Sequence, residues 1–233
     1  YKSVYQHNVP LVLSRGCPYR CSFCSVPEFI PVFRYRKLET VIEEIEYWIN
    51  KGRYHFFCHD SIINGDPRWL KKFCETIIEK GWPEEYGMTF GGNVRLQTPM
   101  RDLETMRLYR KAGLVTMITG FESASEPVLK HMKKYTNPIG VREMFDNVRI
   151  VNSENEQPMK FAMQLIIGYL NETEEDFQLT VDFVKEYHDC MSSILTCSGF
   201  LMHETLKQKW ISEGNYMESV SYTHLTLPTN REV

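Results

Sequence analysis

Short apolar runs alternate with amphipathic helical patterns along most of the chain, and this alternation constrains the fold most strongly. The strand-like runs cover residues 9–14, 54–59, 88–90, 115–119, 161–167 and 193–201. Helical patterns separate them, over about 38–51, 66–81, 102–112, 138–151 and 174–187, with a further helix near 126–127. Helices between successive strands indicate βαβ crossovers, which place parallel strands in one sheet with the helices outside it.

The number of these units narrows the architecture. Six β/α units are two fewer than the eight of a closed β/α barrel. Near-continuous apolar runs such as 115–118 and 165–167 are typical of strands that are buried on both faces of a parallel sheet. We therefore predict an α/β fold, a partial (βα)6 TIM-like barrel with parallel strands and outer helices. A doubly wound parallel sheet is the alternative.

Length and charge exclude several classes of protein. The 233 residues suit one large domain. The 27 basic and 30 acidic residues give a net charge of −3, which leaves no electrostatic footprint for binding nucleic acid or an anionic membrane. The longest apolar stretch, near 161–170, is shorter than the roughly 20 residues of a membrane span, and no signal segment opens the chain. We therefore expect a cytoplasmic protein without a membrane span.

The two ends of the chain suggest its domain limits. The first residue is Tyr1 rather than a Met, so we expect residues 1–218 to be the core domain of a longer protein whose upstream domain is missing. Residues 219–233 (SVSYTHLTLPTNREV) carry no helical period and follow no β/α unit. They resemble translated adapter sequence, so we expect a non-native tail. A genuine disordered or edge segment is the alternative.

Three of the seven cysteines are crowded on the loop that follows the first predicted strand. Cys17, Cys21 and Cys24 have the spacing Cys-x3-Cys-x2-Cys, and three thiolates this close can ligate three irons of a 4Fe–4S cubane. No fourth cysteine follows locally, so one iron would stay open to an external ligand, much as a catalytic zinc site keeps an open position. A structural zinc site closed by His7, His55, Cys58 or His59, or a disulfide within the cluster, is a weaker alternative.

This spacing, with the aromatic Phe23 directly before the third cysteine, resembles the radical S-adenosylmethionine (radical SAM) superfamily over about residues 9–217. The resemblance implies a 4Fe–4S cluster whose open iron chelates the amino and carboxylate groups of S-adenosyl-L-methionine (SAM). It implies one-electron cleavage of SAM to methionine and a 5′-deoxyadenosyl radical, which abstracts a hydrogen atom from a substrate. The protein would then need a one-electron reductant such as a flavodoxin or ferredoxin.

Polar residues and glycines follow the second to fifth predicted strands, at the edge where β/α barrels carry their active sites. The residues singled out there are Asp60 and Ser61, Asn93 and Arg95, Glu122 and Ser123, and Gly168. The resemblance implies that Asp60 or Ser61 binds the amino group of SAM. It implies that the SAM carboxylate and ribose are contacted by Asn93, Arg95, Glu122 and Ser123. Phe23 and Gly168 would lie near the adenine. Arg95 can pair with a carboxylate bidentately, and Glu122 can accept hydrogen bonds from ribose hydroxyls.

Each of these positions also has a purely structural interpretation. Asp60 could cap a turn, Gly91-Gly92 could be a bulge or a close backbone approach, and Arg95 could pair with Glu122 across the edge. Lys133-Lys134 is interpreted as a solvated helix face. The remaining cysteines are interpreted as packed core thiols, and they are Cys58, Cys74, Cys190 and Cys197.

Within the superfamily, the chain most resembles members that carry a cobalamin-binding domain before the barrel. The phrases HDSIIN at 59–64, GFES at 120–123 and IGYLNET at 167–173 carry this resemblance. It implies cobalamin as a further cofactor of the full-length protein. Substrate and reaction type cannot be read from such a core, because one fold hosts many chemistries. The rival functions are a non-catalytic iron–sulfur electron carrier and a structural zinc-binding module.

Overall fold

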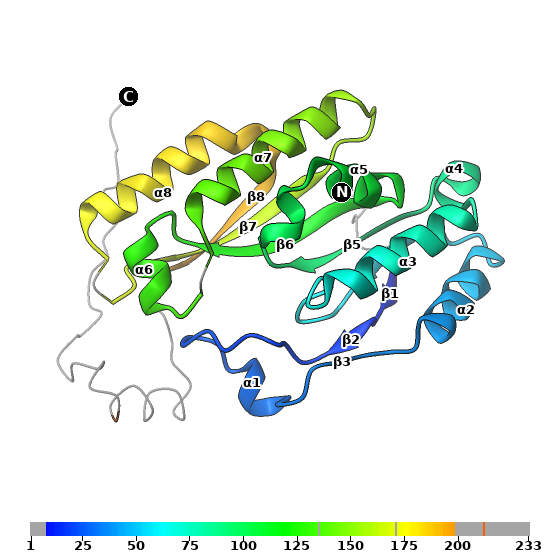
Figure 1. The fold of residues 1–233 in the computed structure, drawn as a ribbon, viewed down its shortest axis with the longest axis horizontal. Helices are drawn as coiled ribbons and strands as arrows, with labels where there is room; N and C mark the ends of the chain where they lie inside the picture. The colour runs from blue at the N-terminus through cyan, green and yellow to red at the C-terminus, as the bar shows by residue number, and fades with distance from the viewer. Residues whose placement is uncertain (1–7, 135, 171, 199–211, 213–233) are drawn as a thin grey trace, which may run out of the picture.

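A computed structural model describes residues 8–134, 136–170, 172–198 and 212 of the chain, and Figure 1 shows its fold. The main sheet has six strands in the order β1-β4-β5-β6-β7-β8, and every neighbouring pair is parallel. These strands are β1 (Val9–Leu11), β4 (His55–Cys58), β5 (Thr89–Val94), β6 (Leu114–Glu122), β7 (Lys160–Ile167) and β8 (Met191–Ser198). The expected tail at 219–233 lies outside the described residues.

The strand order decides between the two predicted architectures. Each crossover adds the next strand on the same side of the previous one, as in a β/α barrel, whereas a doubly wound sheet reverses its order at a switch point. The prediction of an α/β partial barrel is therefore confirmed, and the doubly wound alternative is wrong. β1 and β8 are the two edges of the sheet.

The long helices lie outside the sheet, and Figure 1 shows α3, α5, α7 and α8 along one side of it. They are α2 (Leu38–Ile49), α3 (Pro67–Glu79), α5 (Leu103–Lys111), α7 (Pro138–Ser153) and α8 (Glu174–Tyr187). Each buries an apolar stripe against the strands, as Ile45 and Ile77 do from α2 and α3. Among the described residues, no helix combines the length and apolarity that a bilayer span requires. The shorter helices are α4 (Trp82–Tyr86), α6 (Glu126–His131), η2 (Thr98–Arg101) and η3 (His188–Cys190).

Three strands differ clearly from the sequence expectation. One is the fourth predicted strand, 115–119, which is observed as β6 and continues to Glu122. The first predicted strand is split, because only β1 joins the main sheet, while β2 (Ser14–Arg15) pairs antiparallel with β3 (Arg34–Tyr35) in a small separate ribbon. The one-turn helix α1 (Val26–Phe29) lies between β2 and β3 in the chain. The third predicted strand is longer than expected, because β5 continues through Gly91-Gly92 to Val94. The glycines belong to the strand rather than to the loop after it.

Gly91 is required by the close approach of β5 to β6. A Cβ atom at Gly91 would lie 2.5 Å from the backbone oxygen of Thr116, and the register of the two strands shifts between Phe90 and Gly91. The interpretation of this glycine pair as a close backbone approach with a bulge is therefore confirmed.

We expect Gly91→Ala to lower the free energy of unfolding by about 3 kcal/mol, because the obstructing atom is backbone and cannot rotate away. Denaturant unfolding measures the change. Gly87→Ala is the comparison, since Gly87 has φ +64 and no atom within 4 Å of its Cβ position, so only backbone strain of about 1 kcal/mol applies. A cost at Gly91 no larger than that at Gly87 would contradict the argument.

Candidate active site

The three clustered cysteines lie on the loop between β2 and α1 and face one cavity of about 200 Å³. All three are free and partly buried. The cavity lies at the carboxyl ends of β4, β5 and β6, where a β/α barrel carries its active site. Its other polar lining residues are Tyr19, Ser61, Asn93, Arg95, Glu122, Lys134 and Gln164. The fold thus brings the predicted cysteine site and the polar strand ends to one place.

The start of the cysteine loop is fixed by Asp60, which is 2% exposed. Its carboxylate accepts hydrogen bonds from the backbone N–H groups of Leu13 and Ser14 and from the Ser14 hydroxyl, the last at 2.6 Å. Burial raises the pKa of this carboxyl, while the hydrogen bonds oppose that shift. Asp60 does not line the cavity, whereas Ser61 does. The geometry therefore favours the structural interpretation of Asp60.

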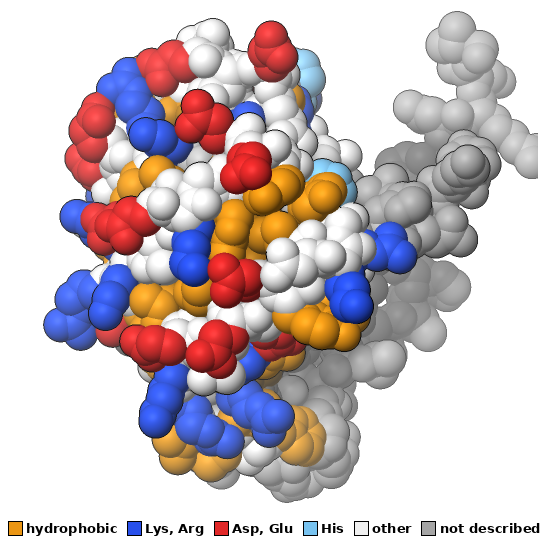
Figure 2. Space-filling model, turned by 90° about the vertical axis from the view of Figure 1, so that its right-hand side faces the viewer, with side chains coloured by type: hydrophobic (Ala, Val, Ile, Leu, Met, Phe, Trp, Pro, Cys, Tyr) orange, Lys and Arg blue, Asp and Glu red, His pale blue; other side chains and the backbone are white. Residues whose placement is uncertain are grey.

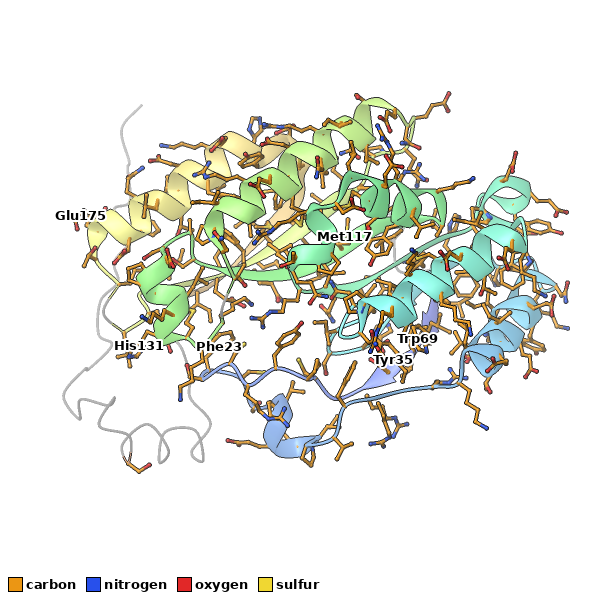
Figure 3. The ribbon with its side chains drawn as sticks, viewed as in Figure 1. Phe23, Tyr35, Trp69, Met117, His131 and Glu175 are labelled. Carbon is orange, nitrogen blue, oxygen red and sulfur yellow. The ribbon has the colours of Figure 1, made fainter. Side chains whose placement is uncertain are left out.

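The far end of the loop is fixed on the opposite side of the cavity. The backbone N–H of Ser22 donates to the carbonyl of Met132 at 2.9 Å, and the Ser22 hydroxyl lies 3.1 Å from the Tyr169 hydroxyl. Phe23 packs against the apolar cluster that contains Met132, and Figure 3 shows it beside His131 at the end of α6. The loop is thus attached both to the end of β4 and to the segments that follow α6 and β7.

The cysteine thiols lie in a partly buried environment that favours their protonated form while no metal is bound. Burial raises the pKa of the Cys17 and Cys24 thiols, and the neighbouring thiols raise it further. Arg95 donates from its Nη1 to the Cys21 sulfur at 3.5 Å, and its positive charge opposes the rise in the pKa of Cys17. Three thiols and one guanidinium at a single cavity fit an anionic iron–sulfur cluster.

The donor set fits a closed zinc site less well. Within the described part of the chain, no three His, Cys, Asp or Glu side chains gather around a position for a single metal ion. A cubane cluster, in contrast, binds each thiolate to a different iron, so its ligands need not converge on one point. The interpretation of the other described cysteines as core thiols is confirmed, because Cys58, Cys74 and Cys190 are buried in the hydrophobic core. The side chain of Cys197 lies outside the described residues.

Arg95 and Asn93 are held in place by the ends of neighbouring segments. The Asn93 side-chain amide donates to the backbone oxygen of Asp60 at 2.7 Å. The Arg95 guanidinium stacks on the Tyr19 ring, 3.9 Å from its centroid, and donates to the backbone oxygen of Lys134 at 2.5 Å. Both side chains are therefore oriented before any ligand binds.

Glu122 and Lys134 form a buried ion pair at the cavity. The Lys134 Nζ lies 3.0 Å from the Glu122 Oε1, and each side chain is only 8% exposed. Glu122 has a positive φ of 67°, which turns the chain at the end of β6. Two structural interpretations were therefore wrong, because Glu122 pairs with Lys134 rather than with Arg95, and Lys134 is not on a solvated face. A sequence signal for the position of Lys134 was available. The helix start at Asn137-Pro138 places Lys134 in a short connection between α6 and α7 rather than on a helix.

The remaining predicted residues stabilise turns beside the cavity. Ser123 is fully buried, accepts a hydrogen bond from the Ser125 N–H and lies 3.3 Å from the Thr180 hydroxyl. Gly168 has φ +74 and donates its N–H to the Glu172 carboxylate at 2.6 Å. The predicted residues that line the cavity are Phe23, Ser61, Asn93, Arg95 and Glu122, and those that do not are Asp60, Ser123 and Gly168. Sequence reasoning did not select Tyr19, Lys134 and Gln164, which also line it.

Comparison with known families accounts for this arrangement. The model of the radical SAM superfamily matches residues 11–184, from β1 into α8. The chain belongs to the radical SAM superfamily. Membership implies a 4Fe–4S cluster and SAM as cofactors, and the loop of Cys17, Cys21 and Cys24 is the part of this chain that fits the cluster.

Three proteins illustrate the breadth of the proteins to which this chain is similar. An anaerobic magnesium-protoporphyrin IX monomethyl ester cyclase from Cereibacter sphaeroides is 34% identical over 172 residues, which cover 72% of this chain and 26% of that protein. A bacteriochlorophyllide d C-12(1)-methyltransferase from Chlorobaculum tepidum is 28% identical over 188 residues, covering 78% and 38%. The structure of the radical SAM methyltransferase TsrM from Kitasatospora setae, with cobalamin and a [4Fe-4S] cluster bound, superposes with a TM-score of 0.70 at 19% identity, covering 81% and 36%. This chain thus spans about a quarter to two fifths of the length of these three proteins.

Proposed function

We propose that this chain is the catalytic core of a radical SAM enzyme in which Cys17, Cys21 and Cys24 hold a 4Fe–4S cluster with one iron open to SAM. The observation that carries the proposal is that the three thiols and the polar side chains at the strand ends line the same cavity. When bound, the cluster supplies the single electron that cleaves SAM to methionine and a 5′-deoxyadenosyl radical for hydrogen abstraction from a substrate.

The chain's own residues supply binding and orientation. Arg95, fixed on the Tyr19 ring, offers a guanidinium that can pair with the SAM carboxylate. In Glu122, Oε1 accepts from Lys134, and Oε2 remains for the ribose hydroxyls. Phe23 offers an apolar ring to the adenine, and Ser61 and Asn93 serve the amino and carboxylate groups. Asp60, Ser123 and Gly168 would act indirectly, by holding the loops that carry these residues.

The complete protein is proposed to be larger than this core. We propose that residues 1–218 form the radical SAM core domain and that the intact protein also carries a cobalamin-binding domain, as the bound cobalamin in TsrM suggests. The proposed cytoplasmic setting would supply an electron carrier such as a flavodoxin or ferredoxin. The relatives include a cyclase and a methyltransferase, which catalyse different reactions. We therefore propose that this core determines the radical chemistry and does not by itself determine the substrate.

Electron paramagnetic resonance of the anaerobically reconstituted, reduced protein tests this proposal. We expect a 4Fe–4S signal whose g values shift when SAM is added, because SAM would ligate the open iron. S-adenosylhomocysteine is the matched control for turnover, since it lacks the sulfonium methyl group and should yield no 5′-deoxyadenosine. A cluster signal that SAM leaves unchanged would support an electron carrier instead. Zinc without iron after anaerobic purification would support a structural zinc module.

A further inference from the structure

Residues 12–37 form a layer beside the main sheet, made of β2, the cysteine loop, α1 and β3 (Figure 1). The exposed charges of this layer are Arg15, Arg20, Arg34 and Lys37 against one carboxylate, Glu28. The whole chain, in contrast, has a net charge of −3. Positive charge is therefore concentrated on the layer that carries the cysteine ligands.

Two of these arginines are placed against each other. In the β2–β3 ribbon, Arg15 is the direct partner of Arg34. Like charges directly opposite in paired strands destabilise the pairing. Neither arginine has an ion pair with any other residue that the structure describes. A binding partner that carries carboxylates would relieve this repulsion.

The same layer exposes two large apolar side chains. Phe29 at the end of α1 is 68% exposed, and Val32 is 60% exposed. At the lower end of the molecule, where Figure 1 places α1 and β3, Figure 2 shows Lys and Arg side chains gathered beside hydrophobic ones. Apolar side chains bordered by unpaired charges of one sign are typical of a surface that binds another protein.

This surface is connected directly to the backbone of the first cysteine. The Arg20 guanidinium donates to the carbonyl of Cys17 at 3.1 Å and to the carbonyl of Pro31 at 3.0 Å. A Cβ atom at Gly16 would lie 2.8 Å from the backbone oxygen of Val32, so the exposed segment packs closely on the residue before Cys17. A protein bound here would lie near the cysteine ligands, and neither Arg20 nor Val32 lines the cavity itself.

Building on the proposed function, we propose that this surface docks an acidic one-electron donor protein. We call it the donor face, formed by Arg15, Arg20, Phe29, Val32, Arg34 and Lys37. One electron passes from the reduced donor to the cluster, so the donor is oxidised by one electron and no atom is transferred. Complementary charge steers and orients such an encounter, and a small apolar centre suits a transient redox interface.

Charge reversal tests the donor face by kinetics. Anaerobic stopped-flow mixing of reduced flavodoxin with the reconstituted protein measures the rate at which cluster absorbance is lost. We expect Arg15→Glu/Arg34→Glu to slow this reaction about tenfold or more at low ionic strength, and added salt to shrink the difference. Photoreduced deazaflavin, an uncharged small molecule, should reduce the variant and the parent protein equally. Lys111→Glu on α5, away from the donor face, is the charge-matched control.

The outcomes separate the donor face from the proposed function. If neither flavodoxin nor deazaflavin reduced the variant, the variant would not hold a competent cluster. If flavodoxin reduced the variant and the parent protein at equal rates, the docking proposal would be overturned. Failure of the parent protein to form a SAM-responsive cluster would instead overturn the proposed function.

Cross-linking provides an independent test, because Lys37 is the amine of the donor face. A carbodiimide joins an amine to a carboxylate in direct contact, so we expect a Lys37 cross-link to flavodoxin. Lys37→Arg keeps the charge and removes the amine, so this product should disappear while the reduction rate by flavodoxin is retained. Cross-links confined to lysines outside the donor face would overturn the assignment.

Discussion

Cys21→Ala is expected to abolish the iron–sulfur cluster and, with it, all SAM cleavage. The chain offers three clustered thiols at the cavity, and two remaining thiolates would leave a second iron without a protein ligand. The Arg95 guanidinium would also lose the sulfur that lies 3.5 Å from it. Iron and sulfide content after anaerobic reconstitution, together with 5′-deoxyadenosine formation, measures the effect.

The matched control for this substitution is Cys74→Ala. Cys74 lies on α3, is fully buried in the hydrophobic core and does not line the cavity. Its loss should lower the free energy of unfolding by about 1 kcal/mol and leave iron content unchanged. A Cys21→Ala protein that kept its full iron content would contradict the assignment of the cluster to this loop.

Lys134→Met is expected to lower the free energy of unfolding by about 3–5 kcal/mol, because it leaves the Glu122 carboxylate buried without its cation. Lys72→Met changes an exposed lysine on α3 and should cost less than about 0.5 kcal/mol. Denaturant unfolding of both variants measures the difference.

A double substitution separates loss of the ion pair from loss of packing. Glu122→Gln in the Lys134→Met background removes the unpaired charge, so it should recover part of the lost stability. If Lys134→Met alone cost no more than Lys72→Met, the buried pair would not stabilise the fold.

The strand order and the cysteine site could be predicted from sequence because both depend on local patterns. The apolar runs alternate with helical periods, and topology rules then allow few arrangements of a parallel sheet. Cys17, Cys21 and Cys24 lie within eight residues of one another, so no long-range contact was needed to bring them together. The strand-end rule likewise placed Asn93, Arg95 and Glu122 correctly on one cavity.

The sequence left open or misjudged the residues whose role is decided by distant segments. Asp60 is a plausible ligand-binding carboxylate until β2 places the Leu13 and Ser14 N–H groups beside it. Lys134 belongs to a sequence of two lysines that looks solvated, and only the end of β6 gives it a buried partner in Glu122. Neither contact leaves a periodic signal in the sequence.

The attachments of the cysteine loop have a consequence for the shape of the sheet. Asp60 fastens one end of the loop just after β4, and Ser22 fastens the other to Met132 and Tyr169, the latter just after β7. In the sheet, β5 and β6 lie between these two strands. The six strands form an open arc, because the edge strands β1 and β8 do not pair with each other. The cysteine loop therefore connects two points on this arc that are separated by β5 and β6. A rigid inorganic core bound to its thiols would set the span of that arc, so the cofactor and the curvature of the sheet would be mechanically coupled.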